Sequence, residues 1–120
     1  MMIKKKKNLV ITDLGSRLPY GVKILVRGKI ETLQGINVLN STVHYGESLQ
    51  EKIEEIKPCL FPMSSMTEEQ EKEYNDLNCY EPGRFPHLEA SLEYLLANKF
   101  DYRELIDEGL AVDATELDVY

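Results

Sequence analysis

The chain lacks tryptophan, and it has only two cysteines and two histidines among its 120 residues. Cys59 and Cys79 lie 20 residues apart with no CxxC pair, a spacing that indicates neither a disulfide framework nor a zinc-finger site. Isolated thiols of this kind stay reduced in the cytoplasm. We therefore expect Cys59 to be a buried, unreactive side chain.

A long apolar run is also missing. A transmembrane helix needs about 18 or more consecutive apolar residues, whereas the apolar stretch behind the N-terminal lysines is only Leu9–Ile11. Such a stretch is too short for the core of a signal peptide. Apolar residues still make up 42% of the chain, which is enough for one packed core. We expect a single cytoplasmic domain, residues 1–120, without a membrane partner.

Sequence motifs for cofactor and metal chemistry are absent as well. The chain has no P-loop, no GxGxxG, no HExxH and no EF-hand calcium loop. Ser64 and Ser65 lack the GxSxG elbow of a hydrolase, and neither His44 nor His87 stands beside Cys59 in the sequence. We expect no cofactor, no metal site and no catalytic residue. An enzyme that uses Cys59 is kept as a third functional hypothesis.

The charge is unevenly distributed along the chain. The formal net charge is −7, yet residues 1–46 hold eight Lys or Arg against two acids, and residues 47–120 hold six against nineteen. Such asymmetry can mark a partner-binding face, or two halves that pack against each other. The negative total disfavours nucleic acid as a partner, because phosphate contacts need a cationic surface. Lys4–Lys7 is expected to be a solvated tail.

Residues 1–46 predict mainly strands, after that basic tail and one short helix. The helix is Thr12–Leu18, because Thr12 or Asp13 can cap its start and Pro19 prevents its continuation. The stretch before it, Leu9–Ile11, fits either helix or strand.

Val22–Leu33 predicts a β-hairpin. A two-residue loop would pair Val26 with Lys29, whereas a three-residue loop pairs Val26 with Ile30 and keeps the apolar residues on one face. The three-residue loop is favoured, because the apolar face sets the register of a half-buried sheet.

Beyond the hairpin, Gly35 predicts a bulge or turn, and Ile36–Tyr45 predicts one or two further strands. The first half is therefore a small antiparallel meander, which can curl into an SH3-like barrel. Residues 47–66 are a connector. Within it, Leu49–Lys57 fits either a helix or a short strand followed by a turn, since Pro58 interrupts the helical spacing.

Residues 67–114 predict helices. Thr67–Gln70 is a capping box, which starts a surface helix over Glu68–Leu77. A second helix begins at Pro86, a residue suited to the first helical position, and runs to about Lys99.

A third helix is predicted over Phe100–Gly109. Asp101 is suited to its N-cap, Gly109 can take the left-handed conformation that ends a helix, and Leu110 can fold back onto it. Ala114–Tyr120 is then an acidic tail or a short final strand. The whole pattern predicts an α+β fold, in which a small N-terminal antiparallel β-meander precedes two or three packed helices.

A group of cations and tyrosines in and around the hairpin is the candidate binding site. Such groups can hold an anionic small molecule or an acidic partner, although lysines at strand edges also discourage edge pairing. The candidate residues are Arg17, Tyr20, Lys23, Arg27 and Tyr45, with Lys29 beside them.

Three stretches of the chain resemble an uncharacterised small protein family common in Bacteroides-type gut bacteria and in their phages and mobile elements. They are SRLPYGVKILV, IEEIKPCLFPMSSMTEEQEKEY and YLLANKFDYRELIDEGLAVDA, in this order, and they cover about half of the chain. The chain departs from the family pattern at Cys59, where an aromatic residue is usual. It also departs at Tyr94, where the family has tryptophan, and at Asn98-Lys99, where the family has paired histidines. The resemblance implies a genomic context and no catalytic residue.

These observations favour a non-enzymatic accessory protein of a phage or mobile element, which binds a host or phage protein, for instance to counter a host defence. A protein that sequesters an anionic metabolite or nucleotide is the second hypothesis. Homo-oligomerisation stays open.

Overall fold

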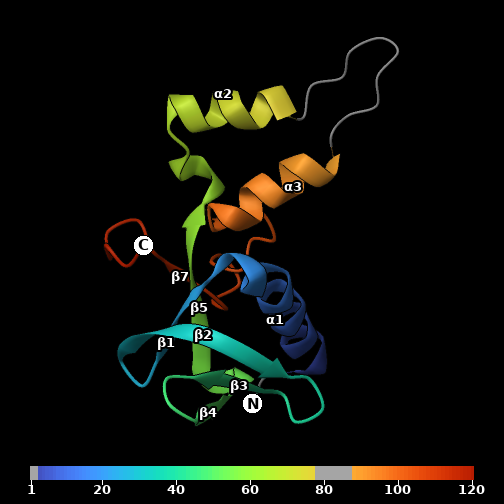
Figure 1. Ribbon diagram of the computed structural model, residues 1–120, viewed down its shortest axis with the longest axis vertical. Helices are drawn as coiled ribbons and strands as arrows, with labels where there is room; N and C mark the ends of the chain where they lie inside the picture. The colour runs from blue at the N-terminus through green and yellow to red at the C-terminus, as the bar shows by residue number, and fades with distance from the viewer. Residues whose placement is uncertain (1–2, 78–87) are drawn as a thin grey trace.

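The structure of the chain is a computed structural model that describes residues 3–77 and 88–120. A curled sheet forms the body together with helix α1 (Lys4–Arg17), and helices α2 (Glu68–Leu77) and α3 (Leu88–Ala97) stand at one end of that body (Figure 1). This arrangement confirms the α+β class. None of these helices combines the length and the apolar character that crossing a bilayer requires.

The sheet contains seven strands within the described residues. The first four form an antiparallel meander, and the last two pair parallel with β5. The sheet does not close, so the SH3-like barrel is not confirmed. In spatial order the strands are β4 (Leu49–Lys52), β3 (Thr42–Tyr45), β2 (Lys29–Asn37), β1 (Lys23–Val26), β5 (Ile56–Pro62) and β6 (Phe100–Asp101), with β7 (Val112–Asp113) also on β5.

Strand β5 joins the two halves of the molecule. Its first half pairs with β1, and its second half pairs with β7 and then β6. Figure 1 shows β5 running from the meander toward the end of the body where α2 and α3 lie. The segment expected to be a connector, residues 47–66, therefore contains two strands. Of the two alternatives for Leu49–Lys57, the strand followed by a turn is correct, with the turn at Ile53–Glu55.

Helix α1 begins at Lys4, so the predicted helix start at Thr12 and the solvated lysine tail were wrong, and Leu9–Ile11 belongs to the helix. No side chain caps its first turn, and no acid lies there. Instead Val10 and Leu14 are buried in the main core, and packing stabilises a helix whose local signals are weak. Pro19 ends the helix as predicted, within a short 3-10 turn at Leu18–Tyr20.

The β1–β2 hairpin has the two-residue loop, with Val26 opposite Lys29, so the predicted three-residue loop was wrong. Arg27 and Gly28 have φ values of +51° and +76°, the signs that a type I′ turn requires, and this turn matches the twist of the strands. Leu33 rather than Ile30 then supplies the buried residue of β2. The register shifts between Leu33 and Gly35, which confirms the predicted bulge.

The helix predicted over Phe100–Gly109 is absent. Parallel pairing with β5 takes Phe100 and Asp101 into β6, and Glu104 has φ +59°, which no α-helix allows. Of the predicted helix, only a turn at its C-terminal end is present. The amide of Leu110 donates to the carbonyl of Leu105 at 2.8 Å, and Gly109, at φ +73°, donates to Ile106 at 3.0 Å. This is a Schellman closure, so the left-handed Gly109 and the buried contact of Leu110 are confirmed.

Helix α2 has the predicted bounds and the predicted capping box. The amide of Gln70 donates to Thr67 Oγ1 at 3.1 Å, and the amide of Thr67 donates to Gln70 Oε1 at 3.0 Å. The predicted start of the next helix at Pro86 lies outside the described residues, and α3 ends at Ala97, before Lys99.

Two glycine substitutions should have opposite effects. Gly109→Ala should lower the free energy of unfolding by about 1–2 kcal/mol, because an L-residue is strained in the left-handed region. Gly15→Ala should raise it by about 0.5–1 kcal/mol, because Gly15 is an exposed residue inside α1 with free space around it. Urea unfolding measures both, and equal signs would contradict the left-handed assignment.

Candidate functional site

The structure does not bring the five predicted binding residues to one surface. Arg17 is 0% exposed. Its Nε donates to Asp13 Oδ2 at 2.8 Å, and its Nη2 donates to the carbonyl of Phe100 at 2.7 Å. Its guanidinium is thus an interior group, which a ligand in solution does not reach.

The other four residues lie in three places. Arg27 and Tyr45 line one hollow of about 290 Å³ beside Leu49, but Arg27 Nε bonds Glu51 Oε2 at 2.7 Å and Tyr45 is buried. This hydrogen bond lowers the pKa of Glu51. Lys23 Nζ donates to Thr32 Oγ1. Tyr20 is exposed, and its carbonyl accepts a hydrogen bond from Lys99 Nζ.

Asp13 lies at the centre of the buried polar cluster. Its carboxylate is 0% exposed and holds Arg17 on one oxygen and Arg103 Nη1 on the other, at 2.6 Å. The guanidinium of Arg103 also lies 4.5 Å from the ring centroid of Tyr102. The sequence suggested Asp13 only as a helix cap. The signal that could have found it is the i, i+4 spacing of Asp13 and Arg17 on an apolar face.

Cys59 is fully buried on β5. Burial raises the pKa of its thiol, so the sulfur stays protonated at neutral pH. The expected burial of Cys59 is confirmed; because a buried neutral thiol is a poor nucleophile, we predict that it is unreactive.

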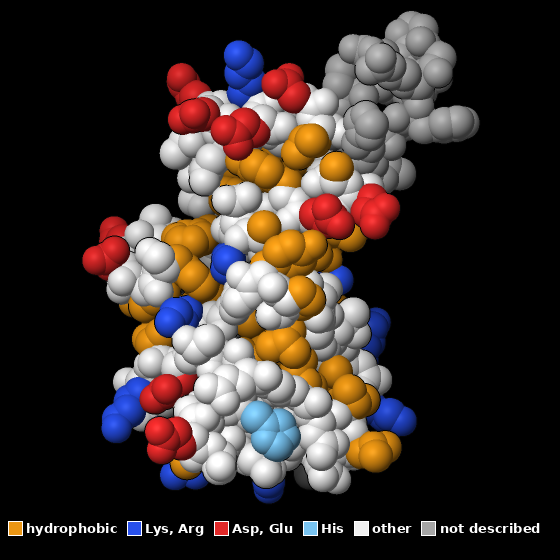
Figure 2. Space-filling model, in the orientation of Figure 1, with side chains coloured by type: hydrophobic (Ala, Val, Ile, Leu, Met, Phe, Trp, Pro, Cys, Tyr) orange, Lys and Arg blue, Asp and Glu red, His pale blue; other side chains and the backbone are white. Residues whose placement is uncertain are grey.

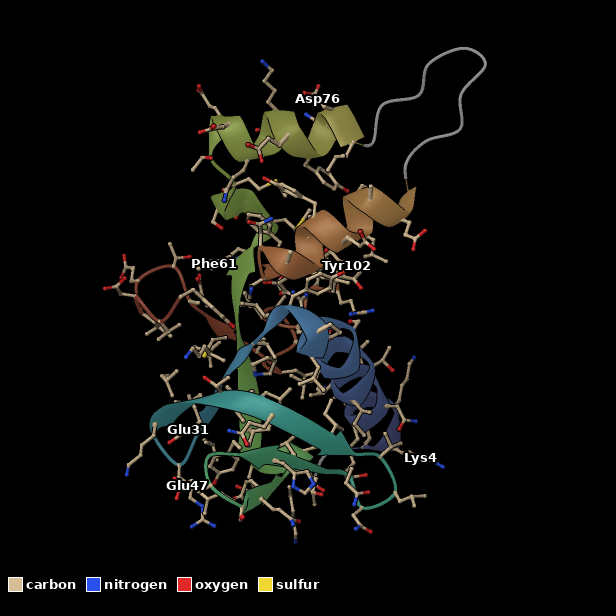
Figure 3. All side chains as sticks on the ribbon, viewed as in Figure 1. Lys4, Glu31, Glu47, Phe61, Asp76 and Tyr102 are labelled. Atoms are coloured by element: carbon tan, nitrogen blue, oxygen red, sulfur yellow. The ribbon has the colours of Figure 1, made fainter. Side chains whose placement is uncertain are left out.

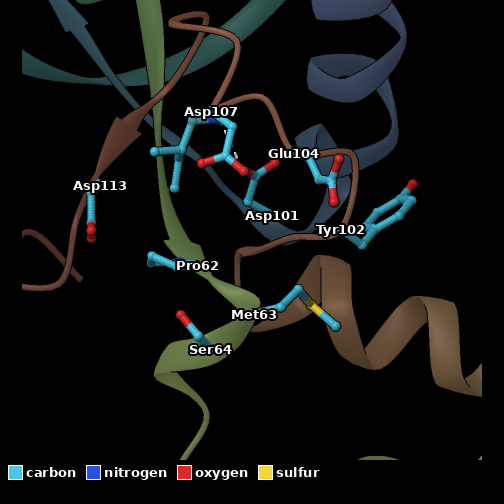
Figure 4. A pocket seen from close by; sticks show the side chains of 9 residues that line it. Pro62, Met63, Ser64, Asp101, Tyr102, Glu104, Asp107 and Asp113 are labelled. Carbon is cyan, nitrogen blue, oxygen red and sulfur yellow. Dashed lines mark hydrogen bonds between the residues drawn. The ribbon is translucent and has the colours of Figure 1, made fainter.

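A hollow of about 460 Å³ lies between the end of β5 and the segment that follows β6 (Figure 4). Four of its lining residues are acids. Asp101 is buried and accepts hydrogen bonds from two backbone amides. Hydrogen bonds from Thr115 lower the pKa of Asp113. Within residues 3–77 and 88–120, no group of three or more His, Cys, Asp or Glu could hold a metal ion. The lining residues are Pro62, Met63, Ser64, Asp101, Tyr102, Glu104, Ile106, Asp107 and Asp113.

Helices α2 and α3 form what we call the acidic arm, residues 68–77 and 88–97. The arm holds seven acids and one lysine, a net charge of −6 within a chain of −7. Figure 2 shows these acids gathered at one end, and Figure 3 places Asp76 on the arm and Lys4 at the opposite end of the molecule. All seven acids are exposed: Glu68, Glu69, Glu71, Glu73, Asp76, Glu89 and Glu93.

The two helices of the arm are attached differently. Leu95 and Leu96 of α3 are buried, whereas α2 has no buried residue. The helices meet through Tyr74 and Tyr94, whose ring centroids lie 6.4 Å apart, and the hydroxyl of Tyr94 donates to Glu73 Oε2 at 3.0 Å. Desolvation, followed by this hydrogen bond, raises the pKa of Tyr94. The inner face of α2 therefore packs on α3, and its acidic outer face is left to solvent.

Comparison with known proteins adds no assignment. The chain matches no protein-family model, no curated protein and no solved structure.

Removing the charge of Asp13 should strongly destabilise the fold. Asp13→Asn leaves two guanidinium groups without their carboxylate, and breaking a buried pair costs about 3–5 kcal/mol. Urea unfolding measures the loss. The matched control is Glu51→Gln, which breaks the exposed pair with Arg27 and should shift the midpoint far less. Equal shifts would contradict the central role of Asp13.

Cys59 should resist alkylation in the folded protein. Iodoacetamide at neutral pH should leave the Cys59 peptide unmodified in the native state and modify it fully in urea, because unfolding exposes the sulfur and removes the cause of its raised pKa. Peptide mapping by mass spectrometry measures both states. Rapid labelling of Cys59 in the folded protein would contradict the prediction of an unreactive thiol and would support the hypothesis of an enzyme that uses Cys59.

Proposed function

We propose that this chain is a non-enzymatic binding protein whose acidic arm binds a basic surface of a protein partner. The observation that carries the proposal is the concentration of charge: the 20 residues of the arm hold a net −6, while the whole chain holds −7.

Within residues 3–77 and 88–120, no ion pair involves an acid of the arm. The ion pairs among these described residues involve Asp13, Glu51, Glu54 and Glu108. Like charges held close together reduce the stability of the folded state. An acidic surface with no ion-pair partner among the described residues is suited to an external cationic partner.

The shape of the arm supports the same proposal. The outer face of α2 is exposed along its length. The partly covered residues of the helix, which include Tyr74 and Leu77, lie on the opposite stripe. Opposite charges on two proteins accelerate their encounter and fix their orientation. Together with the resemblance to proteins of phages and mobile elements, these features favour a host or phage protein as the partner.

The hypothesis of an anionic small molecule gains no comparable support. Of the cations suggested for that ligand, Arg17 is buried against Asp13 and Arg27 is paired with Glu51.

Neutralising three of the seven acids of the arm should weaken partner binding by about tenfold or more while leaving the fold intact. The arm variant is Glu68→Gln, Glu71→Gln and Asp76→Asn, and the control variant is Glu47→Gln, Glu55→Gln and Glu116→Gln. All six residues are exposed, and both variants change the net charge by the same amount.

The measurement is affinity capture from a lysate of Bacteroides-type cells, followed by titration of the purified partner. The wild type and the control should bind, with an affinity that falls as salt rises, and the arm variant should bind about tenfold or more weakly. Circular dichroism checks that the arm variant keeps its helices. Equal binding by the two variants, or no specific partner for the wild type, would overturn the proposal.

A further inference from the structure

The phenol of Tyr120 is inserted between β1 and β5 where their pairing ends. The last paired residues are Ile24 and Pro58, so Lys23 and Cys59 come next on the two strands. The amide of Lys23 donates to the hydroxyl oxygen of Tyr120 at 2.7 Å, and the hydroxyl donates to the carbonyl of Cys59 at 2.8 Å. The hydroxyl thus bridges two backbone groups that face each other across the splayed strands.

The ring of Tyr120 is held by two further groups. The ring of Phe61, which Figure 3 shows on β5 beside the C-terminal segment, has its centroid 5.8 Å away. Lys99 Nζ lies 5.4 Å from the Tyr120 centroid and is fixed by hydrogen bonds to the carbonyls of Tyr20 and Ala97. We call the space bounded by Lys23, Cys59, Phe61 and Lys99 the phenol slot. Burial raises the pKa of the hydroxyl, so it remains a donor at neutral pH.

Most of the residues just before Tyr120 lie on the surface. Residues 115–118 are exposed, and Tyr120 itself is 44% exposed, so the slot opens to solvent on one side. Its specific contacts with Tyr120 are made by the hydroxyl and the ring. A tyrosine from any extended segment could make them.

We propose that the phenol slot is an exchangeable binding site for a tyrosine side chain, occupied in cis by Tyr120 and open to a tyrosine in an extended segment of a partner protein. The ligand class follows from the occupant: a phenol meets one backbone donor, one backbone acceptor, an aromatic ring and a cation. The slot is separate from the acidic arm.

The cis residue competes with any incoming tyrosine. A group tethered by a short segment has an effective concentration in the millimolar range, so Tyr120 reduces the apparent affinity for an external tyrosine. Removal of the side chain should therefore uncover the site.

The test compares the wild type with Tyr120→Ala and Tyr120→Phe. Tyr120→Ala should bind p-cresol saturably, with the amide resonance of Lys23 shifting in a ¹H–¹⁵N spectrum, and should not respond to toluene, which lacks the hydroxyl. A peptide Thr-Glu-Leu-Asp-Val-Tyr should bind Tyr120→Ala about tenfold or more tightly than the wild type. Tyr120→Phe keeps the ring but loses both hydrogen bonds, and it should bind the peptide with intermediate affinity.

Other outcomes would overturn the proposal. Equal responses to p-cresol and toluene would show a nonspecific apolar crevice. If Tyr120→Ala does not fold, the test rests on Tyr120→Phe. If this variant binds the peptide no more tightly than the wild type does, the slot does not exchange its occupant. A concentration-dependent dimer of the wild type that Tyr120→Phe weakens would assign the slot to a second copy rather than to a partner.

Discussion

The fold depends on one buried carboxylate. Asp13 accepts hydrogen bonds from Arg17 of its own helix and from Arg103 of the C-terminal segment, and Arg17 in turn donates to the carbonyl of Phe100. Two of these contacts join residues more than 80 positions apart. The same cluster explains why Arg17, one of the cations suggested for ligand binding, is unavailable, because its guanidinium already binds groups inside the molecule.

The buried packing and most of the net charge lie in different parts of the molecule. The body contains the sheet, α1 and the buried ion pairs, and its charges nearly cancel. The arm contains most of the net charge and few buried side chains. An exposed surface of this kind can change its charge pattern with little effect on the core, since exposed helix positions tolerate substitution.

Several features that depend only on neighbouring residues were predicted correctly from the sequence. The capping box at Thr67, the end of α1 at Pro19 and the left-handed Gly109 were all found from the sequence, because each depends on neighbouring residues alone. The start of α1 and β6 at Phe100 were missed, because tertiary packing and parallel pairing with a distant strand determine them. The charge asymmetry of the chain could be read from the sequence. That the acids of two separate helices gather on one arm became clear only from the structure. The phenol slot could not be predicted from the sequence, since it is formed by backbone groups of separate strands.

Strand β5 also sets the order in which the sheet can be completed. Its pairing with β1 joins segments that are near in sequence, whereas its parallel partners β6 and β7 come from the end of the chain. Contacts at such separation form late, because loop closure costs entropy. Until they form, one side of β5 presents unpaired backbone groups, which invite pairing with other chains. The C-terminal segment therefore acts as edge protection for β5.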